Sequence, residues 1–172
     1  MAPAPWNRDR VLLRVAIKGQ DVAKQDLPPA NLVFLVDVSG SMNSADKLPL
    51  LKSSLKLLVN EMRAQDRISL VTYADGTRIV LPPTSGKDKA TITAAIDALR
   101  SGGSTAGASG IQLAYTAAQQ SFIKGGINRI LLATDGDFNV GIADDRQLKS
   151  MIEERRKSGI SLSTLGFGTG NY

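Results

Sequence analysis

The sequence of 172 residues contains no cysteine and no histidine. The absence of cysteine excludes disulfides and thiolate zinc sites. The absence of histidine excludes Ser–His–Asp and Cys–His catalysis and any imidazole general base. Metal binding by this chain is therefore expected to rest on oxygen atoms from carboxylates, hydroxyls and carbonyls.

Long hydrophobic runs are also missing, and the apolar stretches are far too short to cross a bilayer. The excess of positive charge is small, with 21 Lys and Arg residues against 16 Asp and Glu residues. The densest charged run, residues 153–157, carries both signs and contains no aromatic residue, which indicates a solvated helix face. We therefore expect a globular chain with no membrane-spanning segment and no nucleic-acid partner.

The stretch at residues 31–42, NLVFLVDVSGSM, organises the rest of the sequence. Its apolar run at residues 32–36 is short enough for a strand that is buried on both faces of a parallel sheet. Asp37, Ser39 and Ser41 then place three oxygen side chains at alternate positions, where the strand ends. Ligands of open α/β sheets bind at this location. The stretch therefore predicts a divalent-cation site.

The remaining sequence alternates predicted strands with predicted helices, which favours a mostly parallel sheet with helices on both faces. Asp75-Gly76 is a hairpin signal and predicts an antiparallel edge strand that Pro82-Pro83 stops. We predict strands at residues 11–17, 67–73, 77–81, 129–134 and 160–167. We predict helices after Met42 to about residue 64, over 87–100, from the loop 101–110 to Gly125-Gly126, and from Asp144 or Asp145 to Lys157. Phe122 is expected on the apolar face of the third helix.

The domain organisation that we predict has two parts. Residues 1–30 form an N-terminal extension, in which the strand at 11–17 is added to an edge of the sheet. Residues 31–172 form the domain. Asn43, Ser44 and Asp46 are candidate caps for the helix that follows Met42.

Two further oxygen side chains are expected to reach the site from other loops. Thr105 lies in the Gly-rich segment 101–110, and Asp135 follows the strand at 129–134. Asp37 and Asp135 would emerge at the same edge if their strands are neighbours, and two uncompensated carboxylates would repel each other. A hard cation, Mg²⁺, Mn²⁺ or Ca²⁺, resolves this repulsion. At most five protein oxygens leave a position for water or for a carboxylate of another molecule.

These motifs resemble the von Willebrand factor type A domain. Asp37, Ser39 and Ser41 match the D-x-S-x-S of the family's metal-ion-dependent adhesion site, Thr105 in GGSTAG matches its threonine, and Asp135 in ATDGD matches its second aspartate. The phrases DVSGSM, GGSTAG, ATDGDFNVG and LGFGTGNY are most similar to the bacterial branch found in cell-envelope proteins. The resemblance therefore implies a bacterial cell-envelope or periplasmic location.

The resemblance also implies a fold and a ligand set. The fold is a three-layer α/β/α Rossmann-like sandwich with a mostly parallel central sheet and one antiparallel edge strand. Ser39, Ser41 and Thr105 are implied as direct ligands of a divalent cation, while Asp37 and Asp135 act directly or through water. A Glu or Asp of a partner protein is implied to fill the open position of the metal.

The family usually continues with another helix, a further strand and a C-terminal helix, whereas this sequence ends at Tyr172. We therefore expect a C-terminally truncated domain that lacks the final strand and helix.

Three functions are compatible with these motifs. The leading interpretation is a metal-dependent protein-binding module with no catalysis of its own. The alternative is a Mg²⁺-dependent hydrolase or phosphoryl-transfer enzyme that uses Asp37 as nucleophile or metal ligand. Against this alternative, the residue two positions after Asp37 is Ser39 rather than an acid or base, and no Lys lies immediately beside the motif. The third is a scaffold that no longer binds metal.

Overall fold

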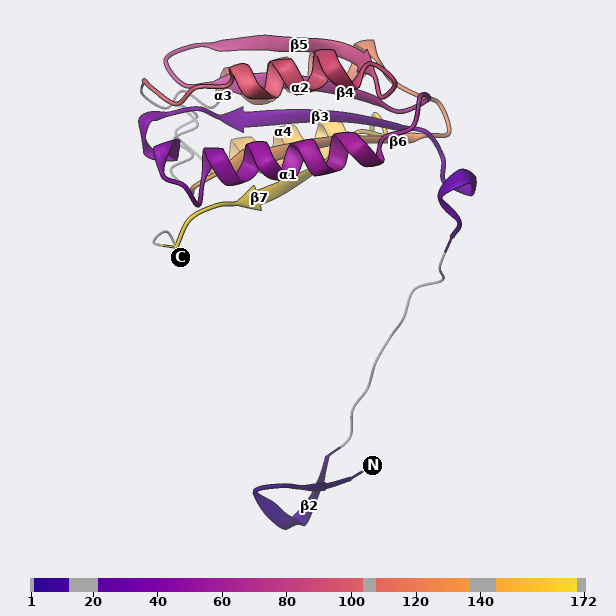
Figure 1. Cartoon of the computed structure of the whole chain (residues 1–172), viewed down its shortest axis with the longest axis vertical. Helices are drawn as coiled ribbons and strands as arrows, with labels where there is room; N and C mark the ends of the chain where they lie inside the picture. The colour runs from indigo at the N-terminus through magenta and orange to yellow at the C-terminus, as the bar shows by residue number, and fades with distance from the viewer. Residues whose placement is uncertain (1, 13–21, 104–107, 137–144, 170–172) are drawn as a thin grey trace.

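The computed structural model describes residues 2–12, 22–103, 108–136 and 145–169, and its centre is a five-stranded sheet (Figure 1). The strand order is β5-β4-β3-β6-β7, in which β5 runs antiparallel to β4 and the other neighbours are parallel. This confirms the mostly parallel sheet with one antiparallel edge strand. The bounds are β3 (Ala30–Asp37), β4 (Arg67–Tyr73), β5 (Thr77–Ser85), β6 (Ile127–Thr134) and β7 (Ser161–Gly166).

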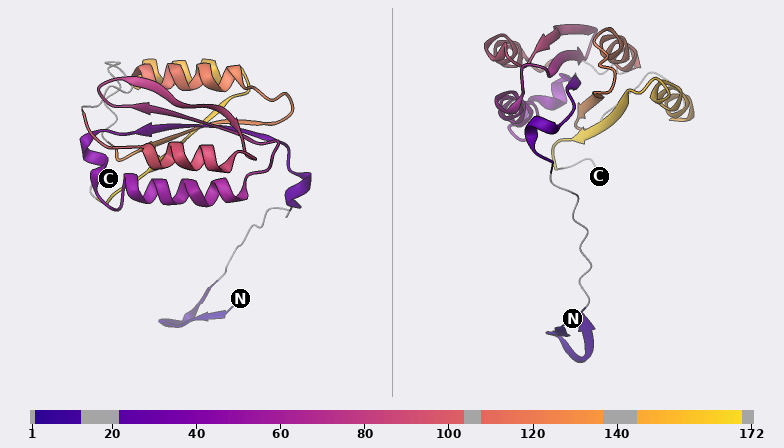
Figure 2. Two further views of the ribbon diagram at one scale, coloured as in Figure 1. Left: turned by 45° about the horizontal axis from the view of Figure 1, so that its top comes forward. Right: turned by 90° about the vertical axis from the view of Figure 1, so that its right-hand side faces the viewer.

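Helices cover both faces of the sheet, as the sequence predicts. Figure 2 shows α1 (Leu48–Glu61) and α2 (Lys89–Ala98) on one face, and α3 (Ala108–Gln120) and α4 (Asp145–Arg156) on the other. The three-layer α/β/α arrangement is therefore confirmed.

The central strand β3 is buried from both sides because its alternate side chains enter two separate cores. Phe34 and Val36 pack in the core that contains α1 and α2, whereas Val33 and Leu35 pack in the core that contains α3. Side chains alternate between the faces of a strand, so an unbroken apolar run is what a strand covered on both faces requires.

Two predicted element ends are wrong, those of β5 and of α3. The strand β5 does not stop at Pro82-Pro83 but continues to Ser85. Its pairing with β4 is irregular over this stretch. Proline has no backbone N–H to donate, and an edge strand accepts it where a bulge interrupts the ladder of hydrogen bonds. The helix before the loop at 121–126 ends at Gln120, so Phe122 lies beyond it and is 40% exposed instead of inward.

The segment after Met42 also differs from the prediction. A 3₁₀ turn, η2 (Gly40–Asn43), comes first, and α1 begins only at Leu48. Ser44 Oγ donates to Asp46 Oδ1 at 2.6 Å, and Lys47 precedes the helix without a side-chain cap. The extra residues place Lys47 at the edge of the predicted cation site.

The described residues 2–12 at the N-terminus do not extend the central sheet. Strands β1 (Ala2–Ala4) and β2 (Asn7–Leu12) pair antiparallel with each other in a separate two-stranded sheet. Residues 11 and 12 of the predicted edge strand therefore belong to this hairpin, and residues 13–17 lie outside the described residues. The division into an extension and a domain at residue 31 stays a prediction.

Residues 24–30 contact the domain through the partly buried ion pair of Arg63 and Asp66. A short 3₁₀ turn, η1 (Lys24–Asp26), lies in this segment. The guanidinium of Arg63 donates to the carbonyl oxygens of Lys24, Leu27 and Pro28 and to Asp66, with Nη2 2.8 Å from Asp66 Oδ1. Although burial opposes it, hydrogen bonds from Arg63 and from the backbone N–H groups of Arg63 and Ala30 lower the pKa of the Asp66 carboxyl.

We expect Asp66→Asn to lower the free energy of unfolding by about 1–3 kcal/mol at neutral pH, because Arg63 loses its charged acceptor. Folding lowers this carboxyl's pKa, so its contribution is complete above the unfolded-state pKa of about 3.9 and is lost as the pH falls through the folded-state value. Urea unfolding of both proteins at neutral and acid pH checks this. An unchanged gap between them in acid would contradict it.

A buried polar network stands at the amino end of β3. Asn31 donates through Nδ2 to Ala118 O at 3.0 Å and to Asn128 Oδ1 at 3.2 Å, and its Oδ1 accepts from Ser121 Oγ at 2.9 Å. Asn128 in turn bonds the backbone N–H and carbonyl of Ile123. The network joins the end of α3 and the start of β6 to the central strand.

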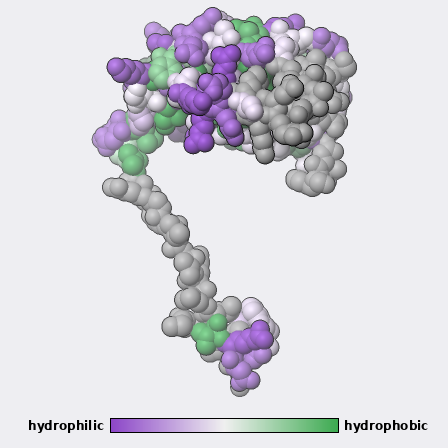
Figure 3. Space-filling model, turned by 180° about the vertical axis from the view of Figure 1, so that it is seen from behind, coloured by the Kyte–Doolittle hydropathy of each residue, from purple (hydrophilic) through white to green (hydrophobic). Residues whose placement is uncertain are grey.

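On the face that Figure 3 shows, the coloured surface is mostly hydrophilic, with apolar residues in small separate areas. In the part of the chain that the structure describes, no helix is both long and apolar enough to span a bilayer.

Candidate metal centre

Three neighbouring strands end at one edge of the sheet and bring the predicted site together. Asp37 ends β3 and lies in register with Tyr73, the last residue of β4. On the other side, Val36 pairs with Ala133 of β6, so Thr134 and Asp135 follow beside Asp37. Parallel pairing in this register therefore places Asp37 and Asp135 side by side, although almost a hundred residues separate them in the sequence.

The carboxylate of Asp37 is completely buried and held in place by three donors. Its Oδ1 accepts from the backbone N–H of Ser39 at 2.8 Å, and its Oδ2 accepts from Tyr73 Oη at 3.1 Å and Thr134 Oγ1 at 3.4 Å. Burial, and then the negative charge of Asp37, raise the pKa of Tyr73 far above its ordinary value. The hydroxyl therefore stays protonated as a donor.

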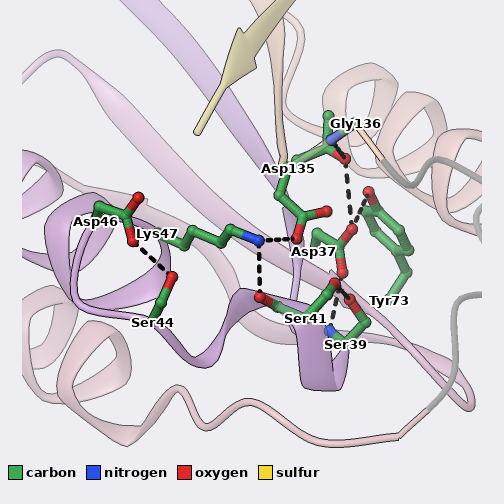
Figure 4. A network of polar contacts seen from close by, with 10 residues as sticks. Asp37, Ser39, Ser41, Ser44, Asp46, Lys47, Tyr73, Asp135 and Gly136 are labelled. Carbon is green, nitrogen blue, oxygen red and sulfur yellow. Dashed lines mark hydrogen bonds and ion pairs between the residues drawn. The ribbon is translucent and has the colours of Figure 1, made fainter. Parts of the chain in front are cut away.

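The two serines of the motif point toward each other (Figure 4). Ser39 Oγ and Ser41 Oγ are 3.0 Å apart. The loop that carries them is tied to the Gly-rich segment, because the N–H of Gly40 donates to Gly103 O at 3.1 Å and the N–H of Gly102 donates to Val38 O at 2.8 Å. Gly103 has a φ of +86°, a conformation that favours glycine.

Asp135 pairs with a cation of the chain itself. Lys47 Nζ is 2.8 Å from Asp135 Oδ2, and the Asp135 side chain is fully buried. The same ammonium donates to the backbone carbonyl of Ser41 at 3.0 Å (Figure 4). No Lys lies immediately beside the motif in the sequence, but the turn before α1 brings Lys47 back over it in space.

Of the five predicted ligands, the structure brings four to this edge. Asp37, Ser39, Ser41 and Asp135 lie there together, while Thr105 lies outside the described residues. The bonds from Gly40 and Gly102 anchor the segment that leads toward Thr105. Its placement at the site stays a prediction.

Three residues of the site were not predicted as part of it. Tyr73 and Thr134 are the last residues of β4 and β6, the two neighbours of β3. They could have been predicted once the strand order was known. Lys47 had no such signal, because the sequence pattern placed it inside or near a helix start and gave no direction for its side chain.

The donor set fits a hard divalent cation. Two buried carboxylates and two facing hydroxyls supply oxygen ligands of the kind that Mg²⁺ and Mn²⁺ prefer. Within residues 2–12, 22–103, 108–136 and 145–169, no three acidic side chains gather as a metal cage, so the hydroxyls are needed. The ion pair of Lys47 with Asp135 shows that a positive group fits beside this buried carboxylate.

A surface groove begins directly beside this site. Val38, Thr72, Arg78 and Arg100 line it, and both arginines are exposed. Val38 lies between the first two residues of the motif, so the groove and the site share one rim. The exposed Asp75 also lines it, so the two arginines leave an excess of one positive charge, which favours an acidic ligand.

The family model of the von Willebrand factor type A domain matches residues 31–172. Among curated proteins, protein YfbK of Escherichia coli (strain K12) is 59% identical over 172 residues, which are 100% of this chain and 30% of YfbK. The Synechocystis protein sll0103 is 30% identical over 168 residues, covering 97% of this chain and 38% of the relative. The chain thus spans well under half of these relatives.

Solved structures share the fold. Proximal thread matrix protein 1 from the mussel byssus, solved with a zinc-occupied MIDAS motif, is 26% identical with a TM-score of 0.63, covering 84% of this chain and 37% of that one. BatB from Bacteroides thetaiotaomicron, 22% identical, has a TM-score of 0.66 and covers 80% of this chain and 66% of that one.

Proposed function

Since the chain belongs to the von Willebrand factor type A domain family, we propose that it is a metal-dependent protein-binding module without catalysis of its own. The observation that carries the proposal is the convergence of Asp37, Ser39, Ser41 and Asp135 at the carboxyl edge of the sheet. Mg²⁺ is the proposed ion, with Mn²⁺ and Ca²⁺ as substitutes of similar oxygen preference.

The proposed roles follow from the chemistry of each residue. Ser39, Ser41 and Thr105 offer neutral hydroxyl oxygens to the cation. Asp37 and Asp135 supply the negative charge, directly or through water. Where Asp37 and Asp135 act through water, only neutral oxygens contact the cation directly, and the cation can then attract a further carboxylate at its open position.

We propose that this carboxylate is a Glu or Asp of a partner protein. The groove beside the site supports an acidic partner, because Arg78 and Arg100 extend the positive surface away from the metal position. Such contacts raise association rates most strongly at low salt.

Two measurements test the proposed function. Calorimetric titration of Mg²⁺ or Mn²⁺ into EDTA-treated, desalted protein is expected to show one saturable site. The tagged chain, incubated with an extract of the source organism, is then expected to retain a partner with Mg²⁺ and to release it in EDTA. A partner that remains bound in EDTA would overturn the proposal. The absence of a measurable metal site would overturn it equally.

Partner binding also predicts a role for the groove. Arg78→Glu is expected to weaken capture of the partner by about 10-fold at low salt, because it places a like charge against an acidic segment. Metal affinity should stay unchanged, since Arg78 lies outside the ligand set. Comparing capture and metal titration for this variant checks both statements, and unaltered capture would exclude the groove from the interface.

Lys47 gives the enzymatic alternative one favourable observation, because a phosphoryl-transfer site needs a cation near its aspartate. Two features argue against it. Asp37 is buried and already accepts three hydrogen bonds, which is poor for a nucleophile. Lys47 is paired with Asp135. Metal-dependent hydrolysis of p-nitrophenyl phosphate that disappears in Asp37→Asn would establish the alternative.

A cell-envelope or periplasmic location stays a prediction that rests on the motif phrases shared with the bacterial branch. Fractionation of the source organism, with detection of the intact gene product by antibody, tests it. Recovery in the cytosolic fraction would contradict it.

A further inference from the structure

Lys47 is positioned by the fold on three sides. Its Nζ lies 2.8 Å from Asp135 Oδ2 and 3.0 Å from Ser41 O. Its aliphatic stem passes the backbone of Gly168, where a Cβ atom would come within 2.8 Å of Lys47 Cε. Gly168 has a φ of +90° and leaves this space open. The side chain is only 19% exposed, so the ammonium is built into the site.

The ammonium and a divalent cation would need the same carboxylate. Asp135 is fully buried, and its negative charge together with that of Asp37 is what attracts a metal. A cation held within hydrogen-bond distance of Asp135 cancels part of this charge and repels a second cation. Both positive groups cannot keep close contact with this one carboxylate oxygen without a large electrostatic cost.

We propose that Lys47 is a resident competitor of the metal: its ammonium neutralises Asp135 in the metal-free domain and is displaced when a divalent cation binds. The inference rests on the proposed metal site and adds a residue that sets the affinity of that site. It explains how two buried carboxylates are tolerated in a folded chain without metal. It also makes occupancy respond to the metal concentration, because binding must break an existing ion pair.

The test compares Lys47→Met with the wild-type chain and with Lys56→Met. Lys56 lies on α1, the helix that Lys47 precedes, and pairs with the exposed Asp97, so its replacement removes the same charge away from the site. Mn²⁺ titration, followed by the electron paramagnetic resonance of free Mn²⁺, is expected to show binding tighter by about tenfold or more in Lys47→Met. Lys56→Met should match the wild type within about twofold.

Thermal unfolding gives a second readout that does not depend on partner binding. In EDTA, Lys47→Met should melt below the wild type, because Asp135 then stays buried without its cation. Saturating Mg²⁺ should remove or reverse this deficit, so the metal-induced rise in melting temperature is larger in the variant.

The outcomes separate this inference from the proposed function. Equal or weaker Mn²⁺ affinity in Lys47→Met, with a measurable site in the wild type, would overturn the competition and leave the metal site standing. Absence of binding in both proteins would overturn both proposals. Binding in Lys47→Met alone would support competition in its strongest form.

Discussion

Asp37→Asn is expected to lose at least about 100-fold in Mg²⁺ affinity while the chain remains folded. The change removes one of the two buried negative charges beneath the proposed cation and keeps the size of the side chain. The hydrogen bonds explain why the fold should survive. An amide has its oxygen on one side only, so it retains either the Ser39 N–H or the Tyr73 and Thr134 hydroxyls.

The stability loss in Asp37→Asn should therefore be about 1–2 kcal/mol, the cost of one imperfect buried contact. Asp88→Asn is the matched control. Asp88 is exposed and precedes α2 at the opposite edge of the sheet, where β5 ends beside the start of β4. Calorimetric metal titration and urea unfolding of both variants measure the two quantities separately. Retained Mg²⁺ affinity in Asp37→Asn would remove Asp37 from the site.

At the other end of the same strand, Asn31→Ala is expected to lower the free energy of unfolding by about 2–4 kcal/mol. Asn31 is completely buried, and its loss leaves the Ala118 carbonyl, the Asn128 amide oxygen and the Ser121 hydroxyl with fewer partners. Each unsatisfied buried group costs about 1–3 kcal/mol, and Ser121 and Asn128 keep other bonds that limit the sum.

Metal affinity should remain at the wild-type value in Asn31→Ala when it is measured well below the melting temperature, because Asn31 lies at the amino edge of the sheet. Urea unfolding followed by circular dichroism, together with the same metal titration, checks both parts. Asn60→Ala, at an exposed position on α1, serves as the control and should change stability by less than about 0.5 kcal/mol. An equal loss of unfolding free energy in Asn60→Ala would show that the buried network around Asn31 contributes no more to stability than an exposed position does.

These two variants separate what β3 does at each end. Its apolar middle and the oxygen residues after it were readable from the sequence because both follow simple patterns: a fully apolar run marks a strand covered on both faces, and Asp37, Ser39 and Ser41 alternate where it ends. The antiparallel edge strand was predictable for a similar reason, since Asp75-Gly76 is a strong turn signal.

Other features depend on contacts between distant residues and left no local signal. The direction of Lys47 follows from η2 and from the start of α1 at Leu48. Ser44 and Asp46, which the sequence offered as caps, predicted an earlier helix start, but their side chains bond each other instead. The course of β5 through Pro82-Pro83 depends on an irregular pairing with β4, which propensity alone does not reveal. In each case tertiary packing decided between local alternatives.

Anomalous diffraction from a crystal grown with Mn²⁺ shows directly whether this edge of the sheet holds a metal ion. We expect one strong manganese peak at the carboxyl edge of the sheet, in contact with Ser39 Oγ and Ser41 Oγ and beside Asp37 and Asp135. A fully occupied manganese peak elsewhere in the molecule, or no peak at this edge at manganese concentrations that saturate the protein in solution, would contradict it.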